Sequence, residues 1–121
     1  MFDSPLIREV TLKDFLQTKS GIKMKNIQSG VLFVGAHWCG HCQSMKKDIE
    51  KIAVIGGIRM GVSFLDGAKP VNKQLLNLLD VSGFPTVFII KKNKLVKYNG
   101  ARDHISILHE LCKSDDKMCF L

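Results

Sequence analysis

Apolar and polar positions along this chain follow two different periods, and the change of period predicts where strands and helices lie. Residues 31–36, "VLFVGA", are apolar without alternation, which is typical of a strand buried on both faces of a central sheet. Apolar positions then recur at spacings of three and four from Cys42 to Ala53. This pattern predicts a helix that begins near Cys39 and ends at Gly56, so Cys39 lies where a buried strand meets a helix.

The remaining segments continue this alternation of strands and helices. Residues 6–10 predict a strand, and Thr11 with Asp14 resembles a capping box that opens a helix through "LKDFLQT", followed by an irregular basic connection over 19–30. The later predicted elements are a strand over 62–66, a helix over 71–79, strands over 86–90 and 95–98, and a last helix with Ile105, Leu108 and Cys112 on one face. This order predicts an α/β fold whose central mixed sheet is flanked on both faces by helices, largely parallel with an antiparallel hairpin at its end.

The length and composition predict one domain over 1–121, with an amino-terminal strand, helix and loop in 1–30 and a polar tail in 114–121. A chain of 121 residues that is 45% hydrophobic can bury a core without a disulfide scaffold. No basic stretch followed by an apolar leader opens the sequence, and no run approaches the roughly 20 apolar residues that span a bilayer. These patterns predict a soluble, cytoplasmic protein without a membrane partner.

The net charge of +7 raises the question of a nucleic-acid surface. The lysines are dispersed over the segments 19–25, 46–47 and 91–94, and aromatic residues are not interleaved with them as base stacking requires. We therefore expect a solvated basic surface and no specific nucleic-acid partner. Attraction to acidic partners stays open.

The segment "HWCGHC", residues 37–42, carries the candidate chemistry. Unpaired N–H groups at the amino end of a helix favour an anion, so the Cys39 thiol should ionise readily, and Gly40 leaves room for a substrate backbone. Cys42 lies one turn later on the same face, close enough to form a disulfide with Cys39. An imidazolium at His41 would stabilise the thiolate and make the disulfide a stronger oxidant.

Other interpretations of the four cysteines must be weighed. A structural zinc site requires four ligands, usually two pairs of cysteine or histidine. The sequence contains no second cysteine pair at the spacing of Cys39 and Cys42, so we expect no metal and no cofactor. Cys112 lies at helical spacing from Leu108 and is predicted to be a buried apolar residue, whereas Cys119 is predicted to be an exposed tail thiol. The alternative for these two is a second, shuttling disulfide that closes 112–119.

Four motifs together resemble the thioredoxin superfamily, and in particular a catalytic domain of protein disulfide isomerases. They are "VLFVGA", "WCGHC", "GFPT" and "YNGARD", and the likeness runs from about residue 31 to 113. The resemblance implies that Cys39 is the nucleophile and Cys42 the buried resolving cysteine. It also implies that Arg102 eases the ionisation of the resolving cysteine. The residues it places against substrate are Trp38, Phe84 and Pro85, the last as a cis-proline.

One position departs from the family pattern. Relatives usually have a buried acid five residues before the tryptophan, which accepts the proton of the resolving cysteine, and this chain has Phe33 there. We therefore expect Cys42 to lose its proton less easily and mixed disulfides to resolve slowly.

The sequence predicts a thiol-disulfide oxidoreductase that acts on protein or peptide thiols and disulfides, with an external thiol or reductase as redox partner. His41 favours an oxidase or isomerase, whereas the predicted reducing compartment favours a thioredoxin-like reductase. A third alternative is a non-catalytic module that holds extended peptides in the groove beside Pro85.

Overall fold

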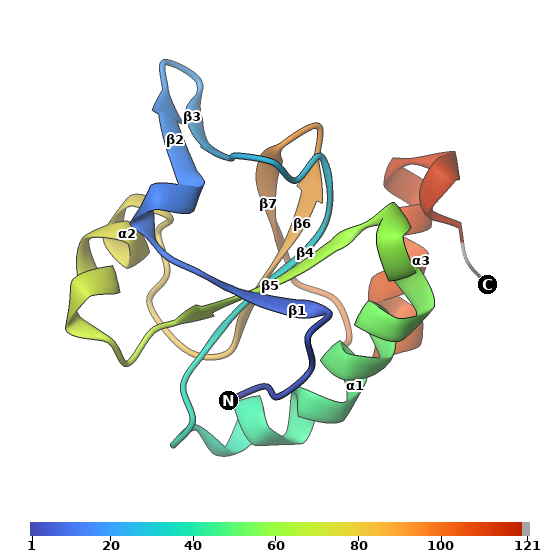
Figure 1. Ribbon diagram of the computed structural model, residues 1–121, viewed down its shortest axis with the longest axis horizontal. Helices are drawn as coiled ribbons and strands as arrows, with labels where there is room; N and C mark the ends of the chain where they lie inside the picture. Colours follow the sequence, from blue (N-terminus) through green and yellow to red (C-terminus); the bar gives the residue numbers. More distant parts are fainter. Residues whose placement is uncertain (120–121) are drawn as a thin grey trace.

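The computed structural model describes residues 1–119 and shows a seven-stranded mixed sheet between two layers of helices (Figure 1). The strands are β1 (Ile7–Val10), β2 (Phe15–Thr18), β3 (Gly21–Met24), β4 (Ser29–Gly35), β5 (Gly61–Asp66), β6 (Thr86–Lys91) and β7 (Lys94–Tyr98). The helices are α1 (Gly40–Gly56), α2 (Lys73–Leu78) and α3 (His104–Ser114). Helices α1 and α3 cover one face of the sheet and α2 covers the other. The predicted layering is thus confirmed.

The sheet has the strand order β1-β5-β4-β6-β7-β3-β2, so β4 lies in its interior between β5 and β6. The segment 31–34 of this strand is fully buried, as an apolar run without alternation predicts. Strand β4 pairs in parallel with β5 and antiparallel with β6, and only the β1–β5 pair adds a second parallel neighbour. The prediction of a largely parallel sheet is therefore wrong, because a long connection brings β6 back against β4 in the opposite direction.

The helix predicted through "LKDFLQT" does not form. The capping contact is present, since the Thr11 backbone N–H donates to Asp14 Oδ2 at 2.9 Å, but it closes only a 3-10 turn over Leu12–Asp14. The chain then enters the β2–β3 hairpin, in which Phe15 pairs with Met24. The predicted irregular connection therefore contains a strand. Alternate residues of this hairpin face the core, and this period of two overrides the capping signal.

Two apolar clusters hold the layers together. The cluster under α1 and α3 contains Phe33, whose ring packs edge-on against Phe2, whereas α2 contributes to the other cluster. Ile105, which the sequence places on one face of the last helix with Leu108, is exposed, as are Val71 and Leu78 of the helix predicted over 71–79. Helix α3 buries Ile107, Leu108 and Leu111 instead. Near α2, Leu75 and Leu79 are buried and Leu76 packs partly buried against the same cluster.

A disulfide closes the carboxyl end of the described chain. Cys112 and Cys119 are bonded, with Cα atoms 4.4 Å apart, because the 3-10 turn Asp116–Met118 reverses the chain after α3. The prediction that Cys112 is an unbonded core residue is wrong, and Cys119 is exposed but not a free thiol. The turn buries Met118 against the cluster under α1. Within residues 1–119, no helix has the length and apolar character needed to cross a bilayer.

Candidate active site at the amino end of α1

Cys39 is the residue that caps α1. Its backbone N–H donates to the Ala36 carbonyl at 3.1 Å, which turns the chain sharply after β4. Its Sγ accepts a hydrogen bond from the backbone N–H of Cys42 at 3.3 Å, and its carbonyl accepts the N–H of Gln43 at 3.0 Å. The sulfur therefore occupies the place that a serine or aspartate oxygen takes at most helix starts. The junction predicted from the sequence is confirmed.

The two cysteines of this motif differ in acidity. The side chain of Cys42, as a hydrogen-bond donor, lowers the pKa of Cys39; burial opposes this, and the backbone N–H groups of Cys42 and His41 and the charge of Arg102 add to the lowering. Burial, and after it the hydrogen bond to Cys39, raises the pKa of Cys42 to about 11. Cys39 is therefore the more acidic thiol of the pair and ionises before Cys42.

The more acidic of the two cysteines is also the more accessible to solvent. Cys39 keeps 9% of its surface exposed, whereas Cys42 is completely buried. An incoming disulfide can therefore reach only the sulfur that also ionises first.

The pocket around Cys42 is apolar. A Cβ atom placed on Gly35 would lie 2.9 Å from Cys42 Sγ and also 2.9 Å from the edge of the Phe33 ring. The ring that replaces the family's acid is thus directed at the space beside the resolving sulfur. Gly35, which sequence reasoning did not single out, leaves the room that both groups need.

Trp38, which precedes Cys39, and Phe84 form an apolar surface, and Pro85 behind Phe84 is buried. The Trp38 and Phe84 rings meet edge to face with centroids 5.9 Å apart, and Trp38 is 64% exposed. The Phe84–Pro85 peptide bond is cis, as the resemblance implies. Gly67 is required here, since a Cβ at that position would lie 2.2 Å from the Phe84 ring.

The three residues expected to tune the redox pair have different positions. Arg102 is exposed and shares with Pro85 the lining of a small pocket of about 160 Å³, from which its charge favours both thiolates. Gly40 faces open space, because a Cβ there would meet no atom within 4 Å. His41 is exposed, and its backbone N–H is the group by which it lowers the pKa of Cys39.

An ion pair beside the site was not predicted from the sequence. Asp48 Oδ1, in the middle of α1, accepts the backbone N–H of His104 at 3.0 Å and lies 2.8 Å from His104 Nδ1. This carboxylate therefore ties the first turn of α3 to α1. The two residues are 56 positions apart, and no local pattern marks them as partners. Among the described residues, no three His, Cys, Asp or Glu side chains gather in a group able to hold a metal ion.

Comparisons with known proteins agree with this geometry. The family model described as Thioredoxin matches residues 14–113. Protein disulfide-isomerase A4 from Homo sapiens is 38% identical over 80 residues, which cover 60% of this chain and 12% of that protein. Protein disulfide isomerase-like 2-2 from Oryza sativa subsp. japonica is 29% identical over 128 residues, covering 84% of this chain and 34% of that protein. The chain thus spans a minor part of these relatives.

Solved structures show the same likeness. Thioredoxin f from spinach chloroplast superposes with a TM-score of 0.67 at 25% identity, over 89% of this chain and 92% of that one. The first thioredoxin domain of mouse protein disulfide-isomerase A4 gives a TM-score of 0.62 at 25% identity, over 82% and 78% of the two chains. Together with the helix-capping cysteine pair, these matches show that the chain belongs to the thioredoxin family, with a domain similar to those of protein disulfide isomerases.

Proposed function

We propose that this chain is a protein thiol-disulfide oxidoreductase whose reaction is carried by Cys39 and Cys42. The Cys39 thiolate attacks one sulfur of a substrate disulfide, forms a mixed disulfide, and releases the other substrate sulfur as a thiolate. Cys42 then loses its proton and attacks Cys39 Sγ. The substrate leaves as a dithiol with two electrons gained, and the Cys39–Cys42 disulfide is left for an external thiol or reductase to reduce.

The observation that supports this proposal most is the asymmetry of the pair. One sulfur caps a helix, keeps some exposure and has a lowered pKa, while its partner is buried and has a pKa near 11. A structural pair would not need this difference, whereas the two-step exchange needs an accessible thiolate followed by a protected thiol.

The apolar surface of Trp38 and Phe84 supports a polypeptide substrate. It adjoins the nucleophile along the chain and presents two aromatic rings with a large exposed fraction on Trp38. An extended chain next to a disulfide can cover this surface and place its sulfur against Cys39. Arg102, which lines a small pocket together with the buried Pro85, adds positive charge that favours the Cys39 thiolate.

The net direction of electron flow separates two versions of this function. The likeness to protein disulfide isomerases and the sequence "CGHC" favour an oxidase or isomerase. The apolar setting of Cys42 and the likeness to thioredoxin f favour a reductase as the alternative. The difference lies in the stability of the Cys39 thiolate, since a more stable reduced form makes a stronger oxidant.

The first experiment measures the reduction potential of the pair by equilibration with glutathione buffers, with the redox state read by mass. A value near that of protein disulfide isomerase, about −180 mV, supports the oxidase or isomerase, and a value near that of thioredoxin, about −270 mV, supports the reductase.

A second experiment tests catalysis itself. Insulin reduction by dithiothreitol should be accelerated by the protein and not by Cys39→Ser, while Ser44→Ala serves as a control one turn further along α1. A wild-type rate equal to that of Cys39→Ser would refute the oxidoreductase.

A further inference from the structure

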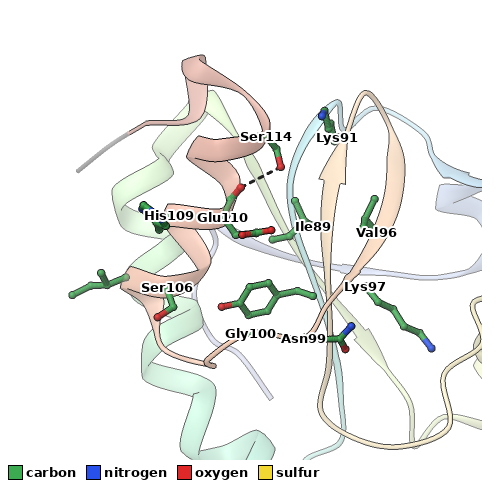
Figure 2. Close-up of a pocket in the computed structure, with 12 residues that line it drawn as sticks. Ile89, Lys91, Val96, Lys97, Asn99, Gly100, Ser106, His109, Glu110 and Ser114 are labelled. Atoms are coloured by element: carbon green, nitrogen blue, oxygen red, sulfur yellow. Dashed lines mark hydrogen bonds between the residues drawn. The ribbon is translucent and has the colours of Figure 1, made fainter.

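A hollow lies between α3 and the β6–β7 hairpin, and neither cysteine of the redox pair lines it. It has a volume of about 810 Å³. In Figure 2, Ile89 and Val96 border it from the strands, and Glu110 reaches into it from α3. None of the residues proposed for the redox reaction lines it.

The strand side of the hollow is apolar. Ile89 and Val96 are directly opposite each other in the β6–β7 pair, so their side chains share the face of the sheet that carries α3. Val96 is nevertheless 55% exposed, because α3 covers β6 and leaves β7 open. Tyr98 continues this face, and its hydroxyl donates to the Ala101 carbonyl. A concave apolar surface of this kind accommodates a side chain from outside.

A row of three lysines borders the same face. Lys91 is opposite Lys94 across β6 and β7, and Lys94 is opposite Lys23 across β7 and β3. Directly opposite residues point to the same face, and Lys91 follows Ile89 by two positions, so the three lysines share the sheet face of Ile89. Lys91 lines the hollow, and the other two continue the row away from it. Neighbouring strands lie about 4.8 Å apart, which makes the row roughly 10 Å long.

This lysine row has no acidic partner within salt-bridge distance among residues 1–119. Like charges directly opposite each other in a sheet are destabilising, so an external anion would relieve a repulsion that the fold leaves in place. The acid of the hollow, Glu110, is on the α3 wall and lies 3.5 Å from Lys113.

We propose that the hollow and the lysine row form a docking site for an acidic polypeptide segment of a partner protein. An apolar side chain of the segment fills the space over Ile89 and Val96, and flanking carboxylates reach the lysines. Three residues of an extended chain span about 10 Å, which matches the length of the row. A concave floor suits a peptide side chain better than a flat membrane.

The position of this site leaves the cysteines free. Pro85 immediately precedes β6, and Lys91 ends it, so six steps of about 3.4 Å, roughly 20 Å, separate the two. A docked partner can therefore stay bound while a substrate occupies the redox site. Docking requires no redox step, so its test is independent of the proposed function.

The probe is a fluorescein-labelled ten-residue peptide of alternating Glu and Leu, with Lys–Leu and Glu–Ser peptides for comparison. Fluorescence anisotropy should show binding of the Glu–Leu peptide at least tenfold tighter than of the other two, and it should weaken as salt rises. The double variant Lys91→Glu/Lys94→Glu should weaken binding at least tenfold, and Val96→Ser at least threefold.

The matched control is Lys13→Glu/Lys73→Glu, which changes the net charge equally at two exposed positions outside the hollow. It should lower the affinity less than threefold, and circular dichroism checks that every variant is folded. Equal loss in both double variants would overturn the proposal, because net charge alone would then explain binding. Tighter binding of phosphatidylserine vesicles or of a 20-nucleotide single strand through Lys91 and Lys94 would also overturn it.

Discussion

The two cysteine pairs of this protein lie at opposite kinds of helix end. Cys39 and Cys42 are reduced and begin α1, whereas Cys112 lies in the last turn of α3 and is bonded to Cys119 beyond the end of that helix. Free N–H groups at a helix start stabilise a thiolate, while free carbonyls at a helix end do not. The same chemical group is therefore prepared for reaction at one place and for cross-linking at the other.

Distance also separates the pairs. Helix α1 has 17 residues, so its two ends are roughly 25 Å apart at about 1.5 Å per residue. Met118, next to the second pair, lines a pocket together with Met60, which follows the far end of α1. Direct exchange within one chain needs contact between sulfurs, and this geometry argues against the shuttling disulfide considered from the sequence.

The largest predicted effect comes from removing the second pair. Cys112→Ser/Cys119→Ser should lower the free energy of unfolding by about 2.5 kcal/mol, the loop-closure value for a cross-link of this length. Insulin turnover should stay within twofold of wild type. Guanidinium denaturation measures the free energy of unfolding, and the turbidity assay of insulin reduction measures turnover. Lost turnover in a variant that unfolds like wild type would give the second pair a chemical role.

The second prediction concerns the asymmetry inside the first pair. At pH 7, iodoacetamide should label Cys39 at least tenfold faster than Cys42, because the pKa of Cys42 is about 11 while that of Cys39 lies below 9.0. The labelling rate of Cys39 should level off at a lower pH than that of Cys42, which should still rise toward pH 11. Peptide mapping by mass follows both, and equal rates would contradict the assignment of nucleophile.

A smaller change is expected when the apolar pocket receives an acid. Phe33→Glu places a carboxylate beside Cys42 that can accept the proton of its thiol. The variant should therefore release substrate from a preformed mixed disulfide about fivefold faster than wild type at neutral pH. Phe33→Leu removes the ring without adding an acid and should not accelerate release. Single-turnover quench experiments measure the rate, and acceleration by both variants would point to loosened packing instead.

The smallest effect is predicted for the contact between α1 and α3. Partial burial alone would raise the pKa of Asp48, but the hydrogen bonds from His104 together lower it. A lowered pKa means that the folded state holds the proton less tightly than the unfolded state. The ionised Asp48 therefore stabilises the folded state at pH values above its pKa in the unfolded chain. This stabilisation is lost as the pH falls through its pKa in the folded state. Asp48→Asn should therefore cost about 1 kcal/mol at pH 7 and almost nothing below the folded pKa.

Thermal unfolding of wild type and Asp48→Asn across this pH range tests the prediction. A constant difference between them at every pH would show that charge is not involved.

The parts of the fold that could be predicted are those with a strong local signal. The buried strand over 31–36 and the helix after Cys39 follow from an uninterrupted apolar run and a regular spacing. The β2–β3 hairpin could not be predicted with the same ease, since Thr11 and Asp14 form a real capping contact that closes only one turn. The capping signal was therefore correct, but the helix that was predicted to follow it is only one turn long.

The site shows the same limit. Cys39 and Cys42 could be recognised because their spacing and helix position are encoded in adjacent residues. The Asp48–His104 contact and the Cys112–Cys119 bond depend on how distant or reversed segments meet, which no periodicity records. Gly35 was missed because its importance is the absence of a side chain beside Cys42.

The apolar pocket of Cys42 has a consequence for the lifetime of the mixed disulfide in the proposed reaction. We expect a buried thiol with a pKa near 11, beside Phe33 instead of an acid, to lengthen that lifetime. Bound clients would then accumulate on the unmodified protein and survive a rapid acid quench. Non-reducing separation followed by mass spectrometry would then identify the clients of the wild-type chain without an engineered cysteine variant.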